Sequence, residues 1–495
     1  MRHLQIIIVC CVLVLVALEG CKVGPDYQRP DIVTPDGWRE RVRTDTSLGQ
    51  EPYWRVYDDA VLHGYIKRSL DSNLDLLAVM ARIEAARAQV TIANSGLFPT
   101  LGVNGDVSGF ANSENRYPGV SGDAFLGPTG VFGLMATLSW ELDVFGRIRR
   151  GTEAQRAQLR ATEEAYRASR VSIVSAVSET YITLRQLDML KEIIDSNLAS
   201  RREYERLAKT LFEGGKTSEL DWRQAEGELR RVEAELPVVK ISIAQTENAL
   251  NVLLGRQPGL AVERGKSLSQ QNVPTALPSG LPSQLIERRP DVVAAERRVA
   301  TAFNRVAEAK AARLPKIALT ANASSISSDL FVLQNHSNPV WGLGANLVAP
   351  IFNGYALQAQ VEIKTAEQKL AVAEYGRIGA RVFGEVEAAL SAQFAADERE
   401  AILARSVAGN ARALELAQAR YKVGSGDLRG VLQQNIALYG ARVALVRVQS
   451  ERRVQRVNLY LALGGGFEVL PPAPEAGPVG AAAPGVAVAG SMSRQ

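Results

Sequence analysis

Two regions of the chain, each with a shorter and a longer run, alternate between apolar residues and polar or very small ones. Residues 131–144 and 340–351 form the longer alternating runs, and shorter runs at 101–107 and 317–323 precede them. One apolar and one polar face over about ten residues suits an outer-membrane β-strand. A half-buried hairpin of a soluble protein gives the same alternation. The pattern therefore predicts two strand pairs and leaves lipid and a soluble core open as their surroundings.

A different pattern follows each strand pair. Residues 147–236 and 351–470 contain no proline, although the chain has 21 prolines. Because proline inside a helix costs about 3 kcal/mol, these gaps predict helices. We expect them at 148–212 and 355–423, each roughly 100 Å long. No compact core needs helices of that length.

A later helix shows how these helices pack. Nine positions follow one another at steps of four and three residues, and seven of them are apolar: Leu432, Ile436, Tyr439, Val443, Val446, Ser450, Arg453, Val457 and Tyr460. This seven-residue repeat favours left-handed coiled-coil packing. An ordinary helical bundle would show the same heptads, but it would not explain the helix lengths.

The long helices are expected to reverse at glycine. Gly214-Gly215 and Gly424-Ser425-Gly426 supply the left-handed backbone conformation that ends a helix. Ser218 and Asp221 match the capping-box pattern for the next helix. Asp427 suits the corresponding N-cap after the second turn. Each pair of helices is therefore predicted to be a hairpin with a tight polar tip.

The hairpins and strand pairs belong to an internal repeat. Phe212-Glu213-Gly214-Gly215-Lys216 matches Tyr421-Lys422-Val423-Gly424-Ser425 at a constant spacing, and the long strands match at the same spacing. Two copies of this size indicate a duplicated domain, not a solenoid. The fold class is mainly α with a small β part, built from a duplicated unit of helix, strand, strand and long helical hairpin. The expected division is 1–20 signal peptide, 21–60 extended segment, 61–255 first repeat, 256–290 linker, 291–466 second repeat and 467–495 disordered Pro/Ala/Gly tail.

The N-terminus predicts export. A basic start and an apolar run of about 15 residues end at Gly20-Cys21, which is typical of a bacterial lipoprotein signal. Cys21 would then carry the lipid, and Lys22 in place of an aspartate points to the outer membrane. The alternative is a plain secretory signal in which Cys21 has no role.

Composition excludes several function classes. The chain has three His residues, and its three Cys residues all lie within the first 21 positions, which argues against a zinc site, a His-based catalytic centre or stapling disulfides. A net charge of +4 is too balanced for a nucleic-acid-binding protein. Esterase, metalloprotease and phosphate-loop motifs are absent from the sequence. We therefore expect no enzyme activity, no metal and no cofactor.

Four strands cannot close a barrel. An open sheet edge in lipid leaves unpaired backbone groups, so a membrane location requires oligomerisation. Two copies would supply eight strands, whose interior side chains fill. Three copies would supply twelve strands and leave room for a channel continued by a helical tube.

These features resemble the outer-membrane efflux factors, the TolC-like channels, in their lipoprotein NodT/OprM-like branch. The matching segments are 20–30 (GCKVGPDYQRP), 140–146 (WELDVFG), 281–291 (LPS…IERRPD) and 461–466 (LALGGG). The resemblance implies a homotrimer with a 12-stranded outer-membrane β-barrel and a 12-helix periplasmic α-barrel. It also implies a passive exit duct of a tripartite pump, joined through a periplasmic membrane-fusion adaptor to an inner-membrane transporter, most often of the proton-driven RND type.

The resemblance also assigns residues. Tyr421 and Asp221 occupy the positions of a tyrosine and its carboxylate partner that close the periplasmic end. Gln433 stands where an acidic pore-lining residue is common, and Gly426 where some members carry arginine. Gly214, Gly215, Val423 and Gly424 match the adaptor-docking tips. Cys21 would carry diacylglycerol and an N-acyl chain.

Alternatives remain at this point. Asp221 can serve only as a helix cap and Tyr421 only as a packing residue, and turn geometry alone would demand the tip glycines. A periplasmic coiled-coil lipoprotein scaffold without a pore is the alternative function. The sequence does not indicate the cargo.

Overall fold

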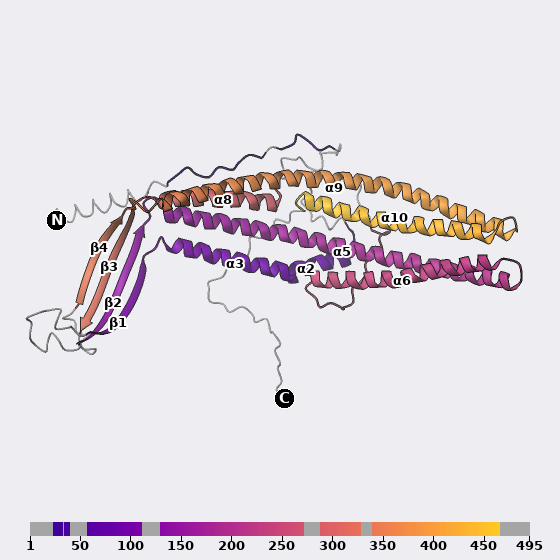
Figure 1. Ribbon diagram of the computed structural model, residues 1–495, viewed down its shortest axis with the longest axis horizontal. Coiled ribbons are helices and arrows are strands. Elements are labelled where there is room, and N and C mark those ends of the chain that lie inside the picture. The colour runs from indigo at the N-terminus through magenta and orange to yellow at the C-terminus, as the bar shows by residue number, and fades with distance from the viewer. Residues whose placement is uncertain are drawn as a thin grey trace, which may run out of the picture.

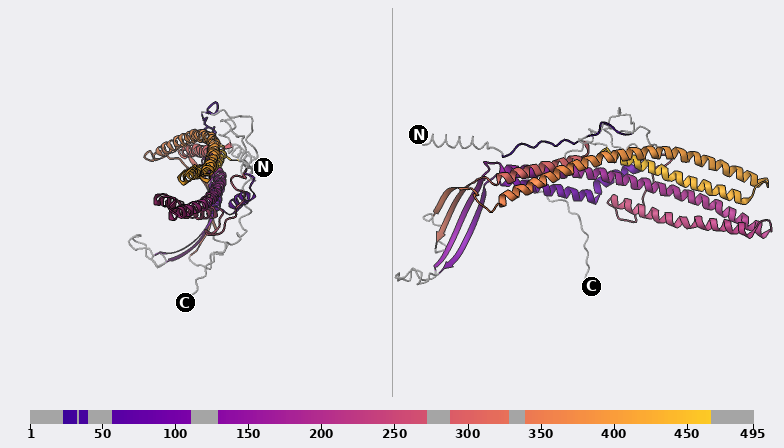
Figure 2. Two further views of the ribbon diagram at one scale, coloured as in Figure 1. Left: turned by 90° about the vertical axis from the view of Figure 1, so that its right-hand side faces the viewer. Right: turned by 45° about the horizontal axis from the view of Figure 1, so that its top comes forward.

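The molecule is long, with a β-sheet at one end and paired helices extending away from it (Figure 1). The computed structural model describes residues 23–32, 34–39, 57–110, 129–271, 288–327 and 339–465. The predicted signal peptide, Cys21 and the C-terminal tail lie outside the described residues. Viewed end-on, the helices form an open arc, not a closed bundle (Figure 2).

The elements confirm the duplicated order of helix, strand pair and hairpin. The first repeat comprises α2 (Ala60–Ser72), α3 (Leu74–Ser95), β1 (Thr100–Phe110), β2 (Thr129–Leu142), α5 (Arg147–Glu213) and α6 (Glu219–Leu253). The second comprises α8 (Pro290–Ala311), β3 (Lys316–Ser327), β4 (Pro339–Val348), α9 (Ala356–Lys422) and α10 (Leu428–Ala462).

The lengths of the helices reproduce the repeat. Both α5 and α9 contain 67 residues, and both α6 and α10 contain 35. Before the strands, α3 and α8 each contain 22 residues. The offset between α3 and α8 is larger than the offset between the hairpins, because more residues separate β1 from β2 than β3 from β4. We call α5–α6 the first hairpin and α9–α10 the second hairpin.

The four strands form one antiparallel sheet in the order β1-β2-β3-β4. The central pair joins the two repeats, with Leu138 opposite Ala321 and Trp140 opposite Leu319. Within this chain β1 and β4 are the edge strands. β2 extends farther than β4 because its last residues, Trp140 to Leu142, pair with β3, whereas the equivalent residues of β4 have no second strand beside them within this chain.

Local chemistry explains most of the helix ends. The Asn73 side chain accepts hydrogen bonds from the N–H groups of Asp75 and Leu76, so it starts α3 where α2 stops. Pro237 lies inside α6, which nevertheless continues to Leu253. Packing of α6 against α5 offsets the local cost of the proline.

The main core lies part-way along the helices. Its buried side chains come from α2 and the residues just before it, α5, α6, α10 and the segment after α6, and include Tyr57, Leu62, Val177, Tyr181, Leu250, Leu268 and Val457. The buried Asp59 carboxylate accepts hydrogen bonds from the Tyr181 hydroxyl at 2.9 Å and the Lys266 N–H at 3.1 Å. This network fixes the segment after α6 to the first repeat.

A second core lies between α8, α9 and the end of α10, and an extended segment covers it. We call this segment, described at residues 23–32 and 34–39, the strap. The Tyr27 ring contacts the Phe303 ring of α8 edge-on, with 5.7 Å between centroids. The Arg29 Nε donates to the Tyr375 hydroxyl of α9 at 3.0 Å. Figure 2 shows the strap running along the outside of the helices from the sheet end.

Candidate functional site: the hairpin tips and the apolar sheet

The two hairpins end in turns of the same geometry. Gly215 and Gly424 have φ angles of 69° and 75°, which favour glycine. In the first turn the Lys216 N–H donates to the Leu211 carbonyl at 2.8 Å, and in the second the Ser425 N–H donates to the Arg420 carbonyl at 3.0 Å. These bonds satisfy carbonyl groups that a helix end would otherwise leave free. The turn prediction is confirmed.

The predicted caps are also present. The Ser218 hydroxyl accepts from the Asp221 N–H at 3.2 Å, and the Asp221 carboxylate returns to the Ser218 backbone, which completes a capping box. Asp427 accepts from the Gly430 N–H at 2.8 Å. Hydrogen bonds from the Ser218 and Thr217 hydroxyls hold the pKa of Asp221 below its usual value. Asp221 therefore stays ionised at neutral pH.

Both predicted closing residues lie near the same end of the subunit. Tyr421 packs, half-buried, on a tip core formed by Ala208, Ala225, Leu428 and Leu432. The Asp221 carboxylate contacts Thr217, Ser218 and, across to the second hairpin, the Arg429 guanidinium at 3.9 Å. The Asp221–Tyr421 link stays a prediction. Gln433 is exposed on α10, and so is the tip residue Val423.

Sequence analysis missed Arg429, whose pairing joins the two hairpins. Gly426 occupies the position where some members of the resembled family carry arginine, and Arg429 supplies a positive charge three residues later. Another missed contact is the hydrogen bond from Gln418 to the Tyr204 hydroxyl at 3.0 Å. Helix phase alone does not reveal either pair, because the two partners belong to different repeats.

A buried polar band lies farther from the tips. Asn197 of α5 and Asn435 of α10 share a hydrogen bond of 3.2 Å, and the Arg201 Nε donates to Asn197 at the same distance. Beside them the Tyr439 hydroxyl donates to Glu235. Burial raises the pKa of Tyr439, and the neighbouring Glu235 raises it further. The second hairpin is thus joined to the first at two levels.

At the other end, one face of the sheet is apolar and exposed. Its exposed residues on β1, β2 and β4 include Leu101, Val103, Val107, Leu134, Trp341, Leu343 and Leu347, and Trp341 and Leu343 are 73% and 79% exposed. The opposite face carries Asn104, Thr137, Asn322 and other small polar residues. A contiguous apolar face of this size marks contact with lipid or another chain.

No helix in the described part of the chain is both long and apolar enough to cross a membrane. Across those same residues, no group of three or more His, Cys, Asp or Glu side chains could hold a metal ion.

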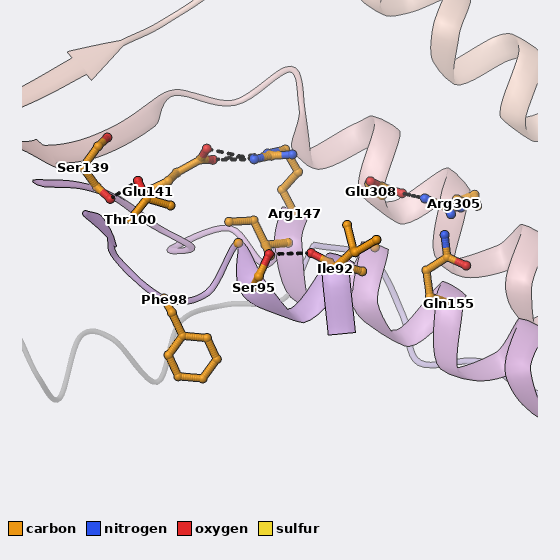
Figure 3. Close-up of a pocket in the computed structure, with 14 residues that line it drawn as sticks. Ile92, Ser95, Phe98, Thr100, Ser139, Glu141, Arg147, Gln155, Arg305 and Glu308 are labelled. Atoms are coloured by element: carbon orange, nitrogen blue, oxygen red, sulfur yellow. Dashed lines mark hydrogen bonds and ion pairs between the residues drawn. The ribbon is translucent and has the colours of Figure 1, made fainter. Parts of the chain in front are cut away.

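A side-chain cluster at the sheet–helix junction surrounds a cavity of about 430 Å³ (Figure 3). The Arg147 guanidinium and the Glu141 carboxylate form a two-point ion pair at 2.8 Å on one side of it. Arg305 and Glu308 of α8 pair at 2.8 Å on another. These charges satisfy one another, so the cavity offers no free charged group from these four side chains.

Comparison with known proteins decides between the possible roles of these surfaces. A family model described as outer membrane efflux protein matches residues 65–256 and 281–465. The chain belongs to the outer membrane efflux protein family. Cation efflux system protein CusC of Escherichia coli O6:H1 is 31% identical over 461 residues, which cover 92% of this chain and 98% of CusC. The probable efflux pump outer membrane protein TtgC of Pseudomonas putida is 30% identical and covers 91% of this chain and 93% of TtgC.

Solved structures agree with the fold. The open state of the Neisseria gonorrhoeae MtrE outer membrane channel superimposes with a TM-score of 0.81 at 26% identity, over 90% of this chain and 98% of MtrE. The predicted family, fold class and outer-membrane location are therefore confirmed. The chain is an outer-membrane channel component of an efflux system, with a periplasmic helical extension.

Proposed function

We propose that three copies of this chain form a closed twelve-stranded barrel and a twelve-helix tunnel, and that this trimer is the passive exit duct of a tripartite pump. The observation that carries the proposal is the four-stranded sheet, which has an exposed apolar face and two free edges, β1 and β4. Free edges are costly in lipid, and pairing β4 of one copy with β1 of the next removes them.

We propose two partners for the duct. The hairpin tips with Gly214, Gly215, Val423 and Gly424 are the surface we assign to a periplasmic membrane-fusion adaptor. An inner-membrane transporter, of the proton-driven RND type, would deliver the cargo. Relatives of nearly equal identity are named for cation efflux and for efflux pumps of Pseudomonas putida. That range supports a duct whose cargo is chosen by the transporter.

Residues at the tips and at the N-terminus complete the proposal. Asp221, Tyr421 and Gln433, together with Arg429, form the periplasmic gate. A glutamine ring at position 433 can hydrogen-bond but cannot hold cations as a carboxylate ring would. Cys21 carries diacylglycerol and an N-acyl chain, and the duct needs no catalytic cofactor. An alternative scaffold without a pore would leave the apolar sheet face without a role.

The test is planar-bilayer conductance of the detergent-purified full-length protein, with its mass measured by light scattering. We expect a trimer that gives small, rarely opening currents, because the gate is closed in the absence of the other pump components. A monomer or dimer without conductance would contradict the duct and return the chain to the scaffold alternative.

A further inference from the structure

The two repeats of the chain pack against each other along one interface, which we call the internal seam. The same kind of interface can form between two copies of the chain. In the internal seam β2 pairs with β3 and α5 packs against α8. The Arg150 Nη1 donates to the Asn304 Oδ1 at 3.3 Å, and a Cβ added to Gly151 would lie 2.9 Å from the Glu308 Oε1. The repeat makes β4 and α9 equivalent to β2 and α5, and β1 and α3 equivalent to β3 and α8. In the proposed trimer, on which this inference rests, β4 and α9 would meet β1 and α3 of the next copy in the same way.

Burial on α3 and α8 agrees with that equivalence. Four residues of α8 are buried in the internal seam, namely Ala300, Asn304, Ala307 and Ala311. Their counterparts on α3, counted from the start of each helix, are all exposed: Glu84, Ala88, Thr91 and Ser95. By contrast, Leu76 and Ile83 are buried like their counterparts Val292 and Val299, because these faces contact the long helix of their own repeat. The face of α3 that lacks a partner is thus the face that α8 uses.

Burial on the long helices has the same asymmetry. Ala154 and Ala161 of α5 are buried in the internal seam. Their counterparts on α9 are larger and exposed, Ile363 at 51% and Leu370 at 59%. Apolar side chains therefore line α9 where a neighbouring α3 would pack. Ile92, the α3 counterpart of Glu308, is also exposed and apolar, which matches this face.

The two seams differ in one component, the strap. In the internal seam the Val23 N–H donates to the Phe145 carbonyl at 3.4 Å, and the Arg150 Nη2 donates to the carbonyls of Gly24 and Pro25 at 3.0 and 3.1 Å. The strap thereby covers the start of α5. Each copy has one strap for two seams. The counterpart of Arg150 on α9 is Ala359, which has no group to bind a strap.

At the matching position on α9 the chain places an aromatic residue in a strained conformation. Gly146 precedes α5 with a φ of 75°, and its counterpart Tyr355 precedes α9 with a φ of 66°. A left-handed conformation is unfavourable for a bulky side chain, and it persists where surrounding structure holds it. Yet the Tyr355 side chain is 73% exposed in the subunit, with the Phe352 ring beside it at 6.2 Å between centroids.

We propose that Tyr355 seals the seam between two copies by packing against the α3–β1 junction of the neighbouring copy, in the space that the strap fills within a chain. In Figure 1, α5 leaves the sheet and α8 runs toward it, so the start of α5 lies opposite the end of α8. The equivalent surface for Tyr355 is the end of α3, formed by Ile92, Ser95 and Phe98. Figure 3 shows these three residues at the sheet–helix junction. Ile92 and Phe98 are exposed and apolar, as a contact for an aromatic ring requires.

The contact is tested by introducing two cysteines, Ile92→Cys and Gln360→Cys, the counterparts of Glu308 and Gly151. The only native cysteines are Cys10, Cys11 and Cys21, so the rest of the protein brings no competing thiol. Oxidation in membranes should produce covalent dimers and trimers that survive heating on a non-reducing gel. The matched control is Asn94→Cys with Gln360→Cys. Asn94 is the counterpart of the exposed Lys310, so its side chain points away from the seam and should not cross-link.

Two outcomes are separable. If light scattering shows a trimer, the trimer conducts in planar bilayers and the Ile92/Gln360 pair does not cross-link, the proposed contact between copies is wrong and the proposed function stands. If no trimer is found, the proposed function itself fails.

The sealing role of the ring is tested by Tyr355→Gly and Tyr355→Phe. Glycine relieves the backbone strain, so a purely local effect would leave the trimer as heat-resistant or make it more so. We expect instead that Tyr355→Gly lowers the temperature at which the trimer dissociates in detergent, whereas Tyr355→Phe keeps it near that of the parent. A Tyr355→Gly trimer that is at least as heat-resistant as the parent would overturn the proposal.

Discussion

The two hairpins have equal lengths and equal turns, yet near the tip the first hairpin carries more internal ion pairs than the second, which pairs Arg412 with Glu415. Near its tip the first hairpin pairs its arginines with glutamates of the same hairpin, as in Arg223–Glu226, Arg230–Glu233 and Arg231–Glu228. The Arg429 guanidinium of the second hairpin pairs instead with Asp221 of the first. A displacement of the second hairpin would break that pair and leave the internal pairs of the first intact. We infer that the first hairpin is the frame and the second is the part that moves.

Apolar packing has the same division. The cluster of Ile194, Leu198, Leu229 and Val232 belongs to the first hairpin, and Tyr439 of α10 is inserted into it. At the tip, Leu428 and Leu432 of α10 join Ala208 and Ala225 of the first hairpin. The second hairpin thus packs against the first through α10, while much of α9 stays exposed. Opening requires α10 to change these contacts.

The largest expected effect comes from removing both predicted gate groups. Asp221→Ala with Tyr421→Phe deletes the carboxylate that faces Arg429 and the Tyr421 hydroxyl, while the Tyr421 ring that packs on the tip core is kept. We expect higher single-channel conductance than in the parent. The control is Tyr421→Phe alone, which should conduct less than the double variant. Unchanged conductance in the double variant would exclude a gate at these residues.

The sequence predicts the helices and turns that carry this gate better than it predicts the ion pair between the two hairpins. Proline-free stretches and glycine turns set the bounds of α5 and α9 to within one residue, because helix breakers act locally. The caps Ser218 and Asp427 follow from the same local chemistry. Arg429 could not be assigned in that way, since its partner Asp221 belongs to the other repeat and only the packing of two hairpins brings them together.

The exposed sheet face and the buried polar band also show that local patterns are predictable and that contacts between the two repeats are not. Alternation predicted which strand residues share a face, and the register confirms it for Leu138 and Ala321. The hydrogen bond between Asn197 and Asn435 was not predicted, because Asn435 lies between the stripe positions Leu432 and Ile436 and the apolar pattern does not single it out. Its partner depends on the phase of a helix that belongs to the other repeat.

A smaller effect is expected from Arg429 alone. An exposed ion pair contributes about 0.2–1 kcal/mol, and three copies act together in a trimer. Arg429→Ala should therefore raise the open probability several-fold, with less change in conductance than the double variant produces. The matched control is Arg230→Ala, which removes a pair within the first hairpin. Equal effects of the two substitutions would contradict the division into frame and moving part.

The caps allow a local test of the same division. Ser218→Ala removes the capping box of the first hairpin and Asp427→Ala removes the single cap bond of the second, and each should cost about 0.5–2 kcal/mol of local helix stability. Hydrogen exchange of the backbone amides should rise at the substituted tip. Both substitutions should raise the open probability, Ser218→Ala through its contact with Asp221, and Asp427→Ala more strongly because it loosens the moving hairpin. Ser218→Thr serves as a control that keeps the cap.

The smallest effect concerns pH and Asp221. Its pKa lies below the ordinary 3.8 because the hydroxyls of Ser218 and Thr217 donate to the carboxylate, with a lesser contribution from Arg429. A depressed pKa means that the ionised form stabilises the tip, fully above pH 3.8, and that this contribution is lost as pH falls through the folded-state pKa. Open probability should therefore stay level from pH 7 to about 5 and rise below 3.8. Single-channel records across that range measure it, with Asp221→Asn as the control. If the Asn variant shows the same rise, other carboxylates carry the response and Asp221 does not hold the second hairpin in place.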